Sequence, residues 1–427
     1  MASARDEPIG ERISDRFRAL RHRNFRLFWS GQLVSLIGTW MQSVGQAWLM
    51  HRLTDSALML GLLGFCQFVP ISALSLWAGV VVDRMDKRRL ILLTQSLALV
   101  QALALAILAA AHLVQPWMLL GLAAVFGAIS AFDLPARQSF LVEMVGKEDL
   151  SNAIALNSAA FNAARVLGPA AAGVLLAVAG ETTCFFANAA SYLVVIAMLM
   201  RVEVERRPRR EESPGSRLGE GIAYGWRTAP IRNLLLLLGV MCGLGFQYTT
   251  LLPVYARQIL NAGPRAYGLM VSAFGLGSLL SAVVLTRRQD RWALRRNLLT
   301  GLLVAGVGMG VFAWSRWLPL TLLMGFAAGF GLILYVASTN MMLQLTTEDR
   351  FRGRVMSLYT FMFVGTAPIG ALLAGGIAQR WGAPWANTLC AAVLLGGAVW
   401  VLYRLRVLAA REAAVGAVTP VTAERVG

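Results

Sequence analysis

The chain has 427 residues, of which 57% are hydrophobic and only 14% are charged. Soluble domains are about 45–50% apolar with about a quarter of their residues charged, so this composition excludes an ordinary soluble protein built around one core. In a soluble protein, the net charge of +17 would suggest a nucleic-acid partner, so the positions of the basic residues must be considered first.

Twelve stretches of the chain largely avoid charge over about 17–25 residues, the length of helix that crosses a hydrocarbon core of about 30 Å. They predict an all-α integral membrane protein with 12 transmembrane helices. In chain order the predicted helices cover 27–50, 58–82, 90–111, 116–136, 152–178, 184–200, 233–256, 267–286, 297–315, 319–343, 355–379 and 384–403.

The basic residues lie mainly on one side of this predicted topology. If the N-terminus is cytoplasmic, the cytoplasmic side holds 33 of the 39 lysines and arginines, and the opposite side holds 5. This excess follows the positive-inside rule, so both termini are predicted to be cytoplasmic. The basic residues then face the anionic lipids of the inner leaflet, and no separate basic domain remains to bind nucleic acid. We therefore expect the lipid bilayer, and no nucleic acid, among the partners.

The second half of the chain repeats the first. Glu148-Asp149, for example, returns as Glu348-Asp349 at an offset of 200 residues. Two six-helix halves in the same orientation imply a pseudo-twofold axis along the membrane normal, with a path between the halves. The predicted organisation is a cytoplasmic N-terminal tail (1–26), a first half (27–200), a cytoplasmic linker (201–232), a second half (233–403) and a cytoplasmic tail (404–427).

The loop after the second predicted helix reads G-V-V-V-D-R-M-D-K-R-R from Gly79 to Arg89. It resembles the loop signature G-x-x-x-D-R-x-G-R/K-R/K of the major facilitator superfamily, with Asp86 where that family usually has glycine. The resemblance implies a conformational latch that closes the cytoplasmic side against the start of the eleventh helix, near Arg352. The predicted latch residues are Gly79, Asp83, Arg84, Lys87 and Arg88.

A second copy of this signature follows the eighth predicted helix. It keeps Asp290 and Arg291 but has Thr286 in place of the glycine. The resemblance implies a symmetric latch against the fifth helix. A solvated positive loop is the alternative interpretation of both copies.

The end of the fourth helix, Phe132–Phe140, and the segment Asn162–Gly173 of the fifth resemble the branch of the superfamily that contains the bacterial enterobactin exporter and related efflux proteins. Gly168-Pro169 and Gly173 also resemble the end of the superfamily's antiporter motif. The resemblance implies the major facilitator fold and favours export.

Three charged residues lie in or next to the predicted spans. Arg165 is near mid-membrane, where a charge is costly enough that it should face a cavity or a partner, and it shares one helix face with Asn162. Asp133 and Arg137 are four residues apart. Asp133 is the acidic candidate for proton coupling, and Arg165 and Arg137 are candidate cavity charges. The alternatives are a structural hydrogen bond for Arg165 and a local ion pair for the other two.

Uncharged polar residues form a stripe on the first helix and smaller patches on the seventh and tenth. The stripe consists of Gln32, Ser35, Thr39, Gln42 and Gln46. Five polar side chains facing lipid would be unfavourable, so the stripe should line the central path or another helix. The resemblance implies that helices 1, 4, 7 and 10 line the substrate cavity, although ordinary helix packing is an equally good explanation for each residue. The predicted cavity residues are Gln32, Thr39, Gln42, Gln46, Asn162, Gln247, Tyr248, Tyr335 and Asn340.

The energy source follows from what the sequence lacks. Its two lysines, Lys87 and Lys147, do not end a phosphate-binding loop, so the chain cannot hydrolyse ATP by that route and must use an ion gradient or the gradient of the solute itself. Its cysteines and histidines have no metal-ligand spacing. We therefore expect no cofactor, no metal and no enzymatic activity. The sequence predicts a monomeric, proton-linked secondary exporter of an amphipathic small molecule, such as a drug or siderophore, in a bacterial cytoplasmic membrane. A proton-coupled uptake symporter and a non-transporting sensor or assembly protein are the alternatives.

Overall fold

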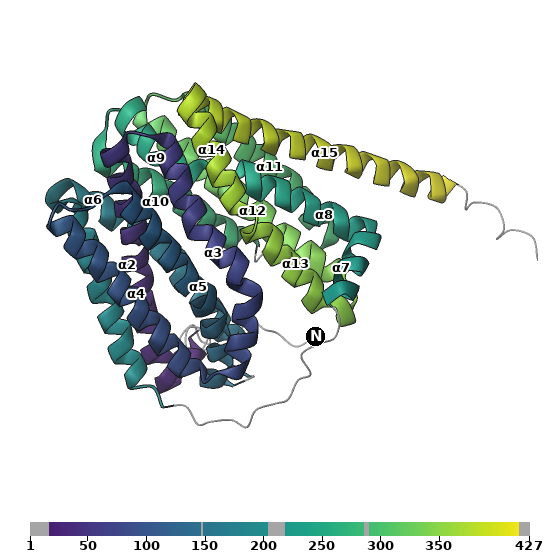
Figure 1. Ribbon diagram of the computed structural model, residues 1–427. Helices are drawn as coiled ribbons and strands as arrows, with labels where there is room; N and C mark the ends of the chain where they lie inside the picture. Colours follow the sequence, from purple (N-terminus) through teal and green to yellow (C-terminus); the bar gives the residue numbers. More distant parts are fainter. Residues whose placement is uncertain (1–16, 147, 204–217, 286–289, 418–427) are drawn as a thin grey trace, which may run out of the picture.

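The computed structural model describes residues 17–146, 148–203, 218–285 and 290–417, and within these ranges the chain is helical and has no strand. Figure 1 shows the helices as two groups. The first group contains η1 (Arg18–Arg21), α2 (Arg23–Thr54), α3 (Ala57–Arg84), α4 (Lys87–Ala110), α5 (Pro116–Val145) and α6 (Leu150–Met200).

The second group begins with α7 (Leu218–Arg227), which lies inside the predicted linker, and it contains two π-helical turns, η2 and η3. Its elements are α7, α8 (Ala229–Val240), η2 (Met241–Gly245), α9 (Tyr248–Val254), η3 (Tyr255–Ile259), α10 (Gly263–Leu285), α11 (Arg291–Trp314), α12 (Leu318–Thr346), η4 (Asp349–Phe351), α13 (Arg352–Val364), α14 (Ala367–Trp381) and α15 (Ala383–Ala417).

Ten helices of the described residues are long and apolar enough to cross a membrane. One of them, Leu150–Met200, is counted once although its backbone turns at Gly180, whose φ of 76° lies in the left-handed region that glycine adopts without strain. The 32-residue helix α2 is not among the ten. Its buried glutamines, such as Gln32 and Gln42, lower its hydropathy without exposing polar groups to lipid.

The two groups meet at one end and diverge toward the end where the described part of the chain begins, at the start of α2 (Figure 1). The contacts join α3 to α14 and α6 to α10. We call the end that carries residues 55–58, 257–263 and 379–384 the closed end, and the opposite end the terminus end.

Small residues bring the helices of the two halves together near the closed end. A Cβ atom at Gly61 would lie 2.6 Å from the carbonyl oxygen of Ala371, and one at Gly375 would lie 2.8 Å from the Cα of Gly61. On the other side, a Cβ at Gly268 would lie 2.6 Å from the Cα of Gly173. Membrane helices associate through such close backbone approaches, because lipid gives little hydrophobic drive for helix contact.

Exposed tryptophans mark both ends of the helices. On α11, Trp292 is 68% exposed and Trp314 is 55% exposed, and 22 residues at 1.5 Å per residue separate them by about 33 Å along the axis. Arg296 stacks over Trp292, and Arg380 stacks over Trp381 near the closed end. A pair of aromatic belts about 30 Å apart is typical of a protein that crosses a bilayer.

Candidate functional site

The polar stripe of α2 joins helices within the first half. Gln42 donates through Nε2 to Oε1 of Gln101 on α4 at 3.0 Å and accepts from Nδ2 of Asn188 on α6 at 2.8 Å. Gln46 donates to the carbonyl of Leu119 on α5 at 3.1 Å. Buried polar groups require such partners. In the described conformation these two predicted cavity residues therefore fix the packing of the first half.

Two further residues of the stripe have different surroundings. Thr39 donates to the carbonyl of Ser35 at 2.8 Å, and its hydroxyl lies 3.3 Å from that of Tyr192. Gln32 is buried, and its Oε1 has no hydrogen-bond partner in the described part of the chain. A buried unpaired acceptor is costly, so Gln32 retains the capacity to bind a donor from outside the chain.

The predicted cavity residues of the second half are also held locally. Gln247 donates to the carbonyl of Cys242 at 3.1 Å, which satisfies an acceptor at the start of the π-helical turn η2. Asn340 accepts from Nε2 of Gln344 at 2.6 Å. Tyr335 is fully buried, and its hydroxyl has no partner among the described residues. Asn162, in the first half, donates to the carbonyl of Ser158 at 2.9 Å.

Asp133 is the centre of a buried polar network on α5. Its Oδ1 accepts from the hydroxyl of Thr94 at 2.7 Å and from Nε2 of Gln95 at 2.9 Å, and its Oδ2 forms an ion pair with Nε of Arg137. Thr94 and Gln95 belong to α4, so the carboxylate points into the first half. The geometry gives Asp133 one cationic partner and two neutral donors, all from the first half.

Arg165 lies on the face of α6 that contacts the second half. Pro169, four residues later, has no N–H to donate to the Arg165 carbonyl, and a Cβ at Gly275 of α10 would lie 2.9 Å from that oxygen. One residue along, the carbonyl of Val166 accepts from the hydroxyl of Ser272 at 2.9 Å. The exposed carbonyls and small residues of this segment therefore allow α6 to pack closely on α10.

The side chain of Arg165 lies beside the hydroxyl of Tyr248 on α9, in the opposite half. Tyr248 is buried, and its ring stacks on Phe274 with 4.0 Å between centroids. In the described part of the chain, Arg165 forms no ion pair with a carboxylate. The structure thus brings together two predicted site residues from different halves, a pairing that their sequence positions do not reveal.

The predicted latch loop is bonded to the first half. Nζ of Lys87 forms an ion pair with Glu143 at 2.9 Å, and Arg88 donates to the carbonyls of Leu199 and Met200 at 3.1 and 2.8 Å. A Cβ at Gly79 would meet open space. Arg84 is exposed at the end of α3, and the side chain of Asp83 lies outside the described part of the structure.

In the second copy, Asp290 caps α11 by accepting from the backbone N–H of Ala293 at 2.6 Å. Side-chain acceptors at this position satisfy the free N–H groups of the first helical turn. Arg291 begins the helix, and its side chain lies outside the described part of the structure.

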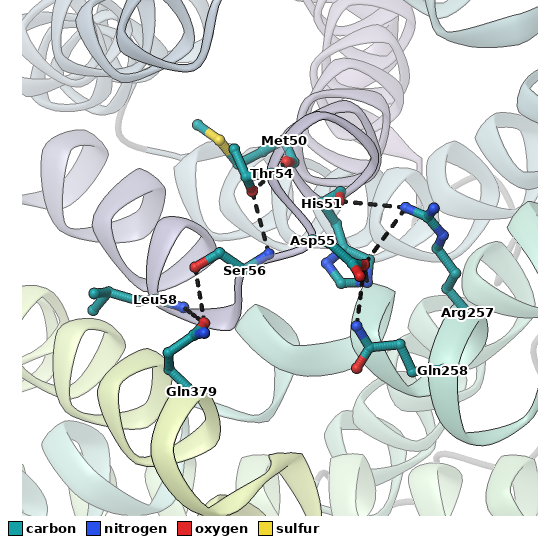
Figure 2. Close-up of polar contacts among 9 residues, drawn as sticks. All are labelled: Met50, His51, Thr54, Asp55, Ser56, Leu58, Arg257, Gln258 and Gln379. Carbon is teal, nitrogen blue, oxygen red and sulfur yellow. Dashed lines mark hydrogen bonds and ion pairs between the residues drawn. The ribbon is translucent and has the colours of Figure 1, made fainter.

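A cluster of polar contacts joins the halves at the closed end (Figure 2). Arg257 donates to the carbonyl of His51 at 3.4 Å, and Gln258 donates to Oδ1 of Asp55 at 3.1 Å. Ser56 donates to Oε1 of Gln379 at 2.8 Å. Sequence reasoning missed this cluster, because single polar residues in short loops carry no signal that they face one another.

The imidazole of His51 is enclosed in this cluster. It is 0% exposed, and neither ring nitrogen has a hydrogen-bond partner among the described residues. Its Nε2 lies 3.7 Å from Oδ1 of Asp55, which is too long for a hydrogen bond. His51 is therefore a buried polar residue within the closed end whose hydrogen-bonding groups are unsatisfied by the described residues.

Two helical groups that meet at one end and diverge at the other are the arrangement of the major facilitator fold, and solved structures share it. Nucleoside transporter NupG superposes with a TM-score of 0.71 at 11% identity, covering 90% of this chain and 98% of its own. A bacterial homologue of the human lysosomal transporter Spinster, inward-facing and occupied, superposes with a TM-score of 0.72 at 13% identity over 91% and 97% of the two chains.

A family model described as transmembrane secretion effector matches residues 14–426. The chain belongs to this family of the major facilitator superfamily, and it is a membrane transporter rather than a soluble protein.

Curated relatives match most of the chain. The staphyloferrin A transporter of Staphylococcus aureus is 26% identical, covering 86% of this chain and 94% of its own. The multidrug efflux pump Tap of Mycolicibacterium fortuitum is 27% identical over 87% and 93% of the two chains. The enterobactin exporter EntS of Salmonella choleraesuis is 24% identical over 83% and 86%. The resemblance to an exporter branch of the superfamily is therefore confirmed.

Proposed function

We propose that the protein is a secondary active exporter of an amphipathic small molecule that works by alternating access in a bacterial cytoplasmic membrane. The observation that carries this proposal is that the inter-half contacts of Figure 2 and of Gly61 with Gly375 lie at one end of the bundle, while the two halves diverge at the other. A transporter that exposes its site to one side at a time requires a bundle that can close at either end.

The proposed topology has twelve spans with both termini in the cytoplasm. It takes α2 as one span and divides α6 at Gly180 into two, which adds two to the ten apolar helices. The positive-inside distribution supports this orientation. The closed end then faces outward, and the described conformation is the one that loads substrate from the cytoplasm.

Relatives support the direction and the kind of substrate. Two of them are named as an enterobactin exporter and a multidrug efflux pump. The test is flux into inside-out vesicles, combined with sensitivity and efflux profiling of a deletion strain against siderophores and amphipathic drugs. Export predicts accumulation in inside-out vesicles. Uptake predicts accumulation in right-side-out vesicles, and a non-transporting sensor predicts flux in neither.

Proton coupling is assigned in this proposal to Asp133. Its carboxylate can exchange a proton only if Arg137 releases it, so a movement of this pair would link protonation to conformation. Asp133→Asn should abolish the dependence of flux on an imposed pH gradient. Glu348→Gln, which alters an exposed carboxylate paired with Arg350, is the matched control. An intact pH response in Asp133→Asn would exclude Asp133 as the coupling group.

The latch proposal is tested in the same assay. Lys87 and Arg88 hold the loop on the first half, so Asp83 moves with that half when the terminus end closes. Asp83→Asn should reduce transport without removing the protein from the membrane. Asp86→Asn is the control, because asparagine preserves the cap that Asp86 gives to α4. Unchanged transport in Asp83→Asn would remove the latch role.

A further inference from the structure

Charge balance in the interior of the bundle singles out one residue. Asp133 and Arg137 neutralise each other as an ion pair. Arg165 has no carboxylate partner in the described part of the chain. It is 15 residues from the start of α6 and 15 residues before the break at Gly180, which places it near mid-depth. An uncompensated cation at this depth is costly, and such residues in membrane proteins face water-filled paths and bind polar groups.

The position of Arg165 along the interface between the halves is equally specific. The described close approaches between α6 and α10 form a series. At one end of it Gly275 of α10 packs on the Arg165 carbonyl, and at the other end Gly268 of α10 packs on Gly173. Arg165 is therefore at the end of this series of close approaches that is nearer the terminus end. A solute entering from the terminus end would meet this guanidinium where the path becomes closed.

The opposite half supplies a second donor at the same point. The hydroxyl of Tyr248 lies beside the guanidinium, and stacking on Phe274 fixes the tyrosine ring. Arginine presents a planar set of N–H donors that matches the two oxygens of a carboxylate. A phenol adds one more donor. Together these groups form a donor set for an oxyanion that is built from both halves.

We propose that Arg165 and Tyr248 bind a carboxylate group of the transported molecule, so that the substrate class is an acidic amphipathic solute rather than a cationic one. The inference rests on the proposed transport function. Binding neutralises the guanidinium, and the solute then bridges the two halves. Closure of the terminus end over an occupied site therefore costs less than closure over a bare cation, because a ligand shifts a conformational equilibrium through its different affinity for the two states.

Binding to the purified full-length chain in nanodiscs tests this proposal without requiring transport. The probes are 1-naphthylacetate, its neutral amide and 1-naphthylmethylamine, which differ chiefly in charge. Wild-type protein should bind the acid about tenfold to a hundredfold more tightly than the amide, and the amine should bind most weakly. Equal binding of acid and amide, or binding of neither, overturns the proposal.

Variants assign the preference to these two residues. Arg165→Gln should bring acid and amide within about twofold of each other, Arg165→Lys should keep part of the preference, and Tyr248→Phe should weaken acid binding while preserving the stack on Phe274. Arg316→Gln, which removes an exposed positive charge beyond the end of α11, is the matched control and should behave as wild type. A preference for the acid that survives in Arg165→Gln overturns the assignment. If Arg165→Gln does not fold, Arg165→Lys and Tyr248→Phe decide the matter.

Binding and flux separate the two proposals. An acid preference that depends on Arg165, found in a protein with no flux in vesicles of either orientation, would reject the transporter function and retain the site. Flux of an identified solute that is unaffected by Arg165→Gln would reject the site and retain the transporter.

Discussion

Ser56 donates its hydroxyl proton to Oε1 of Gln379 over 2.8 Å, and the same oxygen accepts from the backbone N–H of Leu58 at 3.3 Å. One side-chain amide of the second half thus holds the first turn of α3 in the first half (Figure 2). Ser56 also caps α3 by accepting from the N–H of Met59 at 3.3 Å. Its hydroxyl therefore serves the helix and the interface between the halves at once.

The Ser56–Gln379 contact should be measurable as a coupling energy. Ser56→Ala and Gln379→Ala should each weaken the closed end, and in a double-mutant cycle on thermal unfolding they should couple by about 0.5–1.5 kcal/mol. The control partner is Ser75→Ala, which removes a hydroxyl that donates within α3 to the carbonyl of Ser72, and it should be additive with Gln379→Ala. Additivity of Ser56→Ala and Gln379→Ala would mean that their bond contributes nothing to stability.

Adjacent glycines on α14 provide a test of the close helix contact. A Cβ at Gly375 would lie 2.8 Å from both the carbonyl of Ala57 and the Cα of Gly61, whereas one at Gly376 would meet nothing within 4 Å. Gly375→Ala should destabilise the closed end by about 1–3 kcal/mol. Gly376→Ala should be neutral or stabilising by about 0.5–1 kcal/mol, since alanine is the better helix former. The comparison is made by thermal unfolding, and equal effects of the two substitutions would contradict the contact.

Replacing the buried imidazole of His51 by an apolar side chain should stabilise the protein. Both ring nitrogens lack hydrogen-bond partners among the described residues, and each such group costs about 1–3 kcal/mol. His51→Leu should therefore raise the unfolding temperature and lower the access of water-soluble reagents to the closed end. Met50→Leu, an apolar exchange at the neighbouring buried position, should change stability by less than about 1.5 kcal/mol. A loss of stability in His51→Leu would show that the imidazole has a bonding partner outside the chain.

The stability of the contact between η1 and the start of α6 should depend on pH through the Asp149 carboxylate. A hydrogen bond with His22 at 2.8 Å, assisted by the charge of Arg18 at 2.9 Å, holds the pKa of the Asp149 carboxyl below its ordinary value of 3.8. The folded pKa is depressed, so the stabilisation is fully present above pH 3.8 and is lost as the pH falls through the lower folded value.

Hydrogen exchange of the amides in η1 would report this loss. Asp149→Asn should raise exchange at neutral pH and remove the further rise below pH 3.8. Glu148→Gln, at the exposed neighbouring position, should leave the profile as in wild type. If the exchange profile of Asp149→Asn matched that of the wild type, the Asp149 carboxylate would not be the group that stabilises the contact between η1 and α6.

The hydropathy pattern predicted the all-helical membrane fold, because lipid imposes a fixed span length and a helix satisfies its backbone polar groups within one segment. The polar stripe of α2 was more ambiguous. A spacing that places polar residues on one helix face is expected both for a face that lines a path and for a face that packs on other helices. Gln42 shows the second case, because it bonds to residues of α4 and α6. Depth in the membrane identified Arg165 as unusual, but only the packing of α6 on α10 brings it beside Tyr248.

None of the polar contacts at the closed end was predicted from the sequence. Ser56 and Gln379 are 323 residues apart, and each is an unremarkable polar residue near a helix end. Their partnership depends on how two halves dock, and docking follows from backbone approaches at Gly61 and Gly375 that the sequence records only as small residues.

The bonds in Figure 2 are few and mostly at partly exposed groups. Each hydrogen bond of this kind is worth about 0.5–1.5 kcal/mol, so these polar contacts together contribute only a few kcal/mol to the closed end. A contribution of that size is comparable with the effects of changes in bilayer thickness, lateral pressure or temperature. Lipid composition should therefore act on this transporter as directly as its solute does, by altering which conformation the resting membrane favours.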